Sequence, residues 1–286
     1  MNIKMNSKIV LIVGCFVLIA ILGDKTAAAN KVLPKIYEEI GCKEIDGSSS
    51  VISATRFECP DVTSYATDKC YLKGQTFNMG DDVPADIVPD CRAACKCVKN
   101  GDEAASVVCA NVECPEHFGG RNWSCISQYN NVHQCCRVGE ICDEARITSM
   151  NTCEVDGRSY RVGEQIYPDD DSCYKCFCAE NFNNNTSFAD NPNCVKINCG
   201  IELKLTEIKA GCVPVYYKTP TCCPIEYKCP SKDDTIETTT TADATANCKF
   251  GDLTLKHGEK LKSVDKCLKC ECSTPPYITC IKTNDC

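Results

Sequence analysis

Cys-Tyr-Lys-Cys-Phe-Cys occupies residues 173–178, and the adjacent pair Cys222-Cys223 follows it further along the chain. The cysteines around this stretch fall at positions 153, 173, 176, 178, 194, 199, 212, 222, 223 and 229. An upstream set repeats the order with closely similar gaps, at positions 70, 91, 95, 97, 109, 114, 125, 135, 136 and 142. Agreement at ten ordered positions indicates an internal repeat.

Both ends of the chain carry fragments of this repeat. Near the C-terminus, six cysteines reproduce its first six positions: Cys248, Cys267, Cys270, Cys272, Cys280 and Cys286. Near the N-terminus only Cys42 and Cys59 remain, with the spacing that separates the seventh and tenth cysteines of each whole repeat. Ile52-Ser53 stand where the cysteine doublet would be. The sequence therefore predicts an N-terminal segment with a reduced half-repeat (30–69), two whole repeats (70–142 and 153–229) joined by a linker (143–152), a Thr-rich linker (230–247) and a truncated third repeat (248–286).

Residues 1–29 have the pattern of a secretory signal peptide. Lys4 and Lys8 precede an apolar run over residues 9–23, and Ala27-Ala28-Ala29 offers a small-residue cleavage site. The alternative is a membrane anchor, but the run is shorter than the roughly 20 residues that span a bilayer. With 29 cysteines in 286 residues, the chain is expected to be secreted into an oxidising extracellular setting with no membrane span. Removal of Cys15 leaves an even number, 28, as complete pairing requires.

The charge and the motifs argue against several classes of function. The net charge is −8 and there is no block of Lys or Arg, so we expect neither nucleic acid nor a polyanion as partner. The only histidines, His117, His133 and His257, fall at unmatched positions of their repeats, and no catalytic motif surrounds them. We therefore expect no catalytic residues, no enzyme activity and no cofactor. Zinc is the alternative for the C-x2-C pairs, but doublets and an even count favour cystine over a metal site.

The cysteine pattern resembles the von Willebrand factor type C (VWC) module of chordin-like and crossveinless-like secreted proteins. Residues 173–178 and 267–272 match its CxxCxC element, residues 91–97 match with one extra residue, and the doublet matches its CC. Two lead-in stretches also look similar, Tyr160-Arg-Val-Gly163 and Tyr71-Leu-Lys-Gly74. The resemblance implies a small disulfide-rich, mostly β fold of tandem cystine-stapled modules, each made of two subdomains.

The resemblance also implies a disulfide pairing of cysteines 1–4, 2–8, 3–5, 6–9 and 7–10 in each module. For the whole repeats it implies Cys70–Cys97, Cys91–Cys135, Cys95–Cys109, Cys114–Cys136, Cys125–Cys142, Cys153–Cys178, Cys173–Cys222, Cys176–Cys194, Cys199–Cys223 and Cys212–Cys229. For the end fragments it implies Cys42–Cys59, Cys248–Cys272 and Cys270–Cys280. Cys267 and Cys286 have lost their usual partners, so they bond each other or cross-link to another chain.

A rigid scaffold with variable loops favours binding as the function. The resemblance implies an extracellular protein ligand, with a growth factor of the bone morphogenetic protein (BMP) type as the first candidate. It places the contacts in the first subdomain and the segment ahead of it, at residues 60–97 and 143–178. The alternatives are a structural or secreted-fluid component (matrix, reproductive or venom) and, less favoured, a protease inhibitor. The protein would be a monomer or a disulfide-linked oligomer, and non-reducing gels distinguish the two.

The segments outside the cysteine pattern predict linkers and glycans. Sequons place N-glycosylation at Asn122 and at the overlapping Asn184 and Asn185. Residues 143–152 are expected to form a short joint between repeats. The Thr-rich composition of residues 231–247 favours an extended tether, either O-glycosylated or bare.

Overall fold

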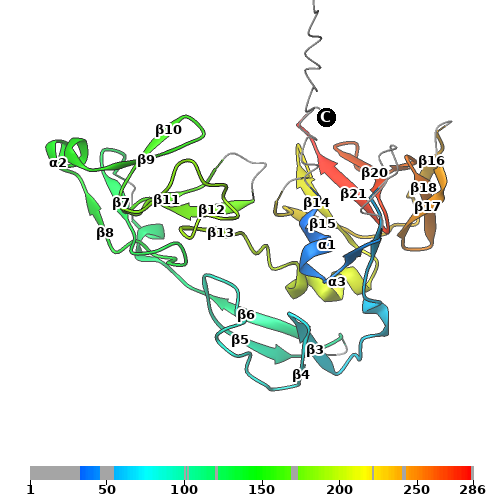
Figure 1. Cartoon of the computed structure of the whole chain (residues 1–286). Helices are drawn as coiled ribbons and strands as arrows, with labels where there is room; N and C mark the ends of the chain where they lie inside the picture. The colour runs from blue at the N-terminus through cyan, green and yellow to red at the C-terminus, as the bar shows by residue number, and fades with distance from the viewer. Residues whose placement is uncertain are drawn as a thin grey trace, which may run out of the picture. The chain divides into compact units, whose positions relative to one another are not determined.

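Short strands dominate the computed structural model (Figure 1), and cystines border many of them. It describes residues 33–45, 55–99, 101, 103–119, 122–168, 173–220, 222–239 and 243–284. The expected signal peptide and Cys286 lie outside these residues. The described elements confirm a small disulfide-rich, mostly β protein.

A hairpin containing the first cysteine opens each of the three first subdomains. The pairs are β3 (Lys69–Leu72) with β4 (Gln75–Asn78), β9 (Thr152–Val155) with β10 (Arg158–Arg161), and β17 (Asp243–Phe250) with β18 (Leu253–His257). In all three the cysteine faces the residue seven positions later: Phe77, Tyr160 or Leu255. The shared register shows that the three hairpins are equivalent.

This register corrects the expected match between the two lead-in stretches. Gly74 lies in the β3–β4 turn at φ +72°, and its equivalent is Gly157 in the β9–β10 turn, also at φ +72°. The partner of Gly163 is instead Gly80, because both donate their N–H to the fourth cysteine of the module, at 2.8 and 2.9 Å. The expected match was wrong because the two Tyr-x-x-Gly strings lie at different positions relative to the hairpin: one spans the β3–β4 turn, and the other begins in β10 and ends after it.

A second hairpin follows in each first subdomain. The pairs are β5 (Arg92–Val98) with β6 (Ser106–Asn111), β12 (Tyr174–Phe177) with β13 (Cys194–Lys196), and β20 (Leu268–Thr274) with β21 (Tyr277–Lys282). Short strands extend two of these sheets, with β11 (Gln165–Ile166) beside β12 and β19 (Lys260–Lys262) beside β20. The third and fifth cysteines face each other across the hairpin at a Cα–Cα distance of 4.0 Å in all three copies.

Each second subdomain is a hairpin closed by the 7–10 disulfide. The strands are β1 (Lys43–Glu44) with β2 (Phe57–Glu58), β7 (Ile126–Gln128) with β8 (Gly139–Ile141), and β14 (Val213–Tyr217) with β15 (Glu226–Lys228). Helices α1 (Lys35–Glu39) and α3 (Leu205–Lys209) each end on a glycine at positive φ, Gly41 or Gly211, directly before the seventh cysteine. The N-terminal fragment is thus equivalent to the second half of the second whole repeat. The described residues also form three 3₁₀ helices: η1 (Val62–Ser64), η2 (Pro115–His117) and η3 (Ile201–Lys204).

Thirteen disulfides have both cysteines among the described residues, and they coincide with the pairs that the resemblance implied. Cys267 is also disulfide-bonded, while Cys286, its expected partner, lies outside the described residues. Because these cysteines are oxidised, they cannot serve as zinc thiolates. Each of the three described clusters of potential metal ligands contains such a cystine.

The largest core belongs to a sheet that crosses the expected boundary between repeats. Its strand order is β15-β14-β21-β20-β19-β16, and β14 pairs in parallel with β21, Val215 opposite Cys280. Val213, Phe250 and Ile278 are buried in this core. The second half of the second repeat and the truncated third repeat therefore share one hydrophobic core.

Both linkers contain regular structure that composition did not predict. In the joint, Asp143 accepts a hydrogen bond from the Arg146 N–H at 2.6 Å and caps α2 (Glu144–Ser149). In the Thr-rich segment, β16 (Thr235–Glu237) pairs with β19, and Ile236 packs against the shared core. The expected tether is wrong for this part, because one apolar side chain is sufficient to add a strand to an available sheet edge.

Among the described residues, no helix has both the length and the apolar character needed to cross a bilayer.

Candidate binding cleft

Helix α1 joins the N-terminal fragment to the second whole repeat. Ile36, Tyr37 and Ile40 are buried in one core with Ile201 and Ile208, which come from η3 and α3. The segments ahead of the seventh cysteine in two copies of the second subdomain therefore share one core, with α1 packed against η3. This core positions the groups described next.

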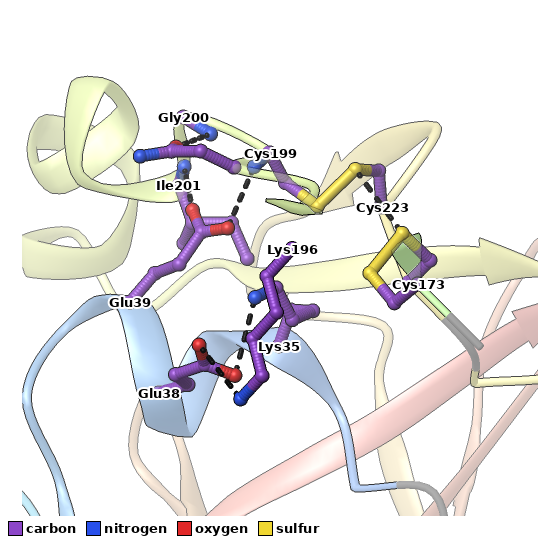
Figure 2. A network of polar contacts seen from close by, with 11 residues as sticks. Lys35, Glu38, Glu39, Cys173, Lys196, Cys199, Gly200, Ile201 and Cys223 are labelled. Atoms are coloured by element: carbon purple, nitrogen blue, oxygen red, sulfur yellow. Dashed lines mark hydrogen bonds and ion pairs between the residues drawn. A yellow bond between two sulfur atoms is a disulfide. The ribbon is translucent and has the colours of Figure 1, made fainter. Parts of the chain in front are cut away.

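Glu39 ties the end of α1 to the backbone at the start of η3 (Figure 2). Its two carboxylate oxygens accept hydrogen bonds from the N–H groups of Cys199 at 2.6 Å and Ile201 at 2.8 Å. These are charge-assisted bonds, which are roughly twice as strong as neutral ones. We call these two hydrogen bonds the Glu39 clamp. Because Cys199 is disulfide-bonded to Cys223, the clamp also fixes α1 to a disulfide of the second repeat.

Glu38 forms ion pairs on the neighbouring face of α1 (Figure 2). Its carboxylate oxygens lie 3.1 Å from the Lys35 ammonium and 3.5 Å from that of Lys196. Desolvation by burial would raise the pKa of Glu38, but the hydrogen bonds and charges of the two lysines outweigh it and lower the pKa. Glu38 and Lys196 are exposed, so their pair adds little stability, whereas Lys35 is buried and Glu38 is the carboxylate that faces its ammonium.

Tyr37 connects the N-terminal fragment to the truncated third repeat. Its hydroxyl donates to the carbonyl oxygens of Thr274 and Tyr277, and its ring stacks on Phe57 at 4.4 Å between centroids. The Phe57 N–H in turn donates to the Pro275 carbonyl at 3.1 Å. Burial raises the pKa of the Tyr37 phenol well above its usual value, so the hydroxyl remains a proton donor at physiological pH.

A cleft of about 790 Å³ opens beside this junction. Its lining comes from three parts of the chain: α1 and its flank, the segment around the first hairpin of the first whole repeat, and the segment leading into η3 and α3. The residues are Lys35, Glu38, Glu39, Ile40, Gly41, Pro60, Val62, Tyr65, Tyr71, Lys73, Gly74, Thr76, Lys196, Ile197, Asn198, Glu202 and Leu205. A smaller pocket adjoins the cleft, sharing Val62, Tyr65 and Tyr71 with it and adding Lys69 and Lys209. The rings of Tyr65 and Tyr71 stack 4.1 Å apart on the shared wall.

The lining is more positive than the rest of this acidic chain. Cleft and pocket together contain five lysines and three glutamates, whereas the whole chain has a net charge of −8. The Glu39 carboxylate already accepts the hydrogen bonds of the Glu39 clamp. The Glu202 carboxylate accepts a hydrogen bond from the Lys73 backbone N–H at 2.9 Å. Burial raises the pKa of Glu202, against the lowering effect of that bond, and the nearby charge of Glu39 raises it further. Among the described residues, the ammonium groups of Lys69 and Lys73 form no ion pair.

Of the two regions expected to contact a ligand, only the first contributes to the cleft. Residues 60–76 supply one wall, while residues 143–178 include the exposed helix α2 and line neither cavity. Lys35, Glu39 and Glu202 could not be predicted as cleft residues, because they lie outside the repeat that supplies residues 60–76.

The expected glycan sites and the histidines lie away from the cleft lining. Asn122, Asn184 and Asn185 are exposed, and the Asn184 side-chain oxygen accepts from the Glu154 N–H at 3.2 Å. His133 lies 3.2 Å from Asp90, measured from Nδ1 to Oδ2, on an exposed surface. His117 and His257 lie in η2 and β18, in different subdomains.

No protein-family model matches this chain, and no solved structure matches it. The VWC resemblance therefore depends on the cysteine pattern alone.

Proposed function

We propose that this chain is a secreted protein whose VWC-like modules bind an extracellular protein ligand, with a growth factor of the BMP type as the first candidate. The observation that supports it is the cleft, whose wall at residues 60–76 belongs to the subdomain that the resemblance assigns to ligand contact. Its volume lies in the range of roughly 300–1,000 Å³ typical of binding pockets. It suits a short segment of a partner better than a flat protein surface.

The chemistry of the lining specifies that segment. Tyr65 and Tyr71 offer stacked aromatic surface, while Lys69 and Lys73 add two ammonium groups that form no ion pair among the described residues. Aromatic side chains are enriched in protein-binding sites, and polar groups surround them at the rim. The ligand segment is therefore apolar at its centre and acidic at its edge.

Surface titration against a panel of BMP-type factors tests this proposal. We expect binding at micromolar concentration or tighter, and about tenfold weaker binding for the double variant K69Q/K73Q, which corresponds to about 1.4 kcal/mol. The matched control is K260Q/K262Q, since both lysines are exposed on β19, outside the cleft, and should leave affinity unchanged. Absence of binding across the panel, or equal affinity for both double variants, would contradict the proposal.

A structural or secreted-fluid component is the second candidate. It is favoured by two strongly exposed aromatic side chains, Phe118 and Trp123, which lie in the first whole repeat away from the cleft. Large exposed apolar side chains are one feature of surfaces that contact other proteins. Disulfide-linked oligomers on non-reducing gels would favour this candidate over a soluble ligand-binding monomer.

A further inference from the structure

Disulfides divide the chain into blocks that one backbone cut cannot separate. The described disulfides overlap so that at least one of them spans every peptide bond within residues 42–59, 70–142, 153–229 and 248–280. None of these disulfides crosses the gaps between the blocks. A cut inside a block therefore leaves its pieces linked, whereas a cut in a gap divides the chain.

The structure favours one gap as the place for such a cut. Four described lysine or arginine residues lie before or between the blocks: Lys35, Lys69, Arg146 and Lys232. Lys35 is buried, and the bond after Lys69 lies inside strand β3, ahead of a buried cysteine. Lys232 lies in a turn fixed by the buried Asp234 carboxylate, which accepts hydrogen bonds from the Ser231 N–H and the Lys228 ammonium, each at 2.8 Å. Arg146 is therefore the accessible position of the four.

Helix α2, which contains Arg146, has no buried residue. Arg146 itself is exposed, and its guanidinium forms no ion pair among the described residues. A helix of six residues is unstable without packing, and the Asp143 cap is the side-chain support of its first turn. Opening this segment into the extended backbone that a protease binds therefore costs little free energy.

We propose that the Arg146–Ile147 bond is a processing site for an extracellular serine protease with specificity for arginine. Such proteases hold the basic side chain of the substrate with a carboxylate in a specificity pocket, and the Arg146 guanidinium has no ion pair to give up. The reaction is hydrolysis. The C–N bond between the two residues breaks, the hydroxyl of a water molecule joins the Arg146 carbonyl carbon, and the remaining hydrogen goes to the Ile147 nitrogen.

The two parts remain associated by packing after the cut. Helix α1 lies in the first part, and the η3 and α3 residues that share its core lie in the second. The Glu39 clamp also joins the two parts. Residues 60–76 and Glu202 then belong to separate chains, so the cleft persists only while the parts stay docked. Cleavage thus makes the cleft dependent on the concentration of the two parts.

Brief digestion of the full secreted chain with trypsin tests the proposal. We expect a new N-terminus at Ile147 and two fragments that separate on an SDS gel without reduction but elute together in native gel filtration. R146Q should slow this division at least tenfold. The matched control is K260Q, which should divide at the wild-type rate, since Lys260 is also exposed but lies inside a block, where a cut leaves the pieces linked.

Three results would overturn the proposal. The first is a chain that divides initially after Lys69 or Lys232. The second is an R146Q variant that divides as fast as K260Q. The third is a pair of fragments that separates only after reduction, because a disulfide would then cross the joint.

The Asp143 cap provides a second readout, which an arginine on a rigid surface would not show. D143A removes the cap, so α2 opens more readily and trypsin should cut about fivefold faster, which corresponds to about 1 kcal/mol. D143N removes the same charge but keeps an equally good cap, so it should be cut at the wild-type rate. Equal rates for the two variants would contradict cleavage through helix opening. The inference depends on the fold and not on the proposed ligand, so a chain that binds no growth factor should still be cut at Arg146.

Discussion

Replacing Glu39 with alanine tests whether its carboxylate holds α1 in place. The substitution removes the acceptor of two backbone hydrogen bonds, from Cys199 at 2.6 Å and Ile201 at 2.8 Å. A hydrogen bond to a charged group contributes about 1.5–3 kcal/mol. The site is partly exposed, so the lower value applies to each bond and the expected loss is about 3 kcal/mol.

Hydrogen exchange measures this loss where it occurs. Since every 1.4 kcal/mol is about a factor of ten in an equilibrium constant, the amides of residues 199 and 201 should exchange roughly 150-fold faster in E39A. Buried Ile36 and Tyr37 lose their alignment with the core at the same time, so protection of α1 should fall with them. Peptide-level mass spectrometry, with reduction after the exchange is quenched, resolves the two segments.

Glu38 supplies the matched control, because it is the neighbouring residue on the same short helix. Its pair with Lys196 is exposed and contributes less than about 1 kcal/mol. Its pair with Lys35 joins an exposed carboxylate to a buried ammonium, but Glu38 accepts no hydrogen bond from the Cys199 or Ile201 amide, so E38A should accelerate exchange at these two amides less than tenfold. If E39A and E38A exchange alike at residues 199–201, the clamp does not hold the helix and the account of the cleft wall is wrong.

Two further substitutions probe the raised carboxyl pKa and the tight backbone. Burial raises the pKa of Glu202, so its ionised form destabilises the fold at neutral pH, and that penalty disappears as the pH falls below the normal carboxyl range. E202Q, which keeps an acceptor for the Lys73 N–H, should therefore raise the melting temperature at pH 7 but not at pH 3; an equal effect at both would exclude this explanation. G251A should have a lower melting temperature than G101A, although the two glycines have nearly the same φ, +56° and +57°. The reason is that an added Cβ would meet a rigid neighbour only at Gly251, where the Cβ of Pro230 would lie 2.7 Å away. Equal melting temperatures would show that the contact relaxes.

The order of cysteines predicted the modules and hairpins because those features are local in the chain. The 7–10 disulfide closes a loop of the same sequence separation, 17, in all three second subdomains. Helices α1 and α3 could not be predicted in the same way, since five residues are too few to show a helical period and are unstable without tertiary packing. The cleft could not be predicted from the sequence either, because its walls come from segments far apart in the chain.

Contacts between the fragments at the two ends of the chain help to hold the N-terminal fragment in place. In a whole repeat, two disulfides run from the doublet to the first half, as in Cys91–Cys135 and Cys114–Cys136. The N-terminal fragment has no doublet, and among the described residues Cys42–Cys59 is its one disulfide.

Non-covalent contacts replace the missing covalent links. The Phe57 N–H and the Tyr37 hydroxyl bond to the backbone of the β20–β21 turn, and Ile36 and Ile40 fill a core shared with the second whole repeat. Such contacts can open without breaking a covalent bond, whereas the halves of the whole repeats cannot separate without reduction. The N-terminal fragment is therefore the part of the described structure that should open first, and because it forms one wall of the cleft, its docking controls whether that cleft exists.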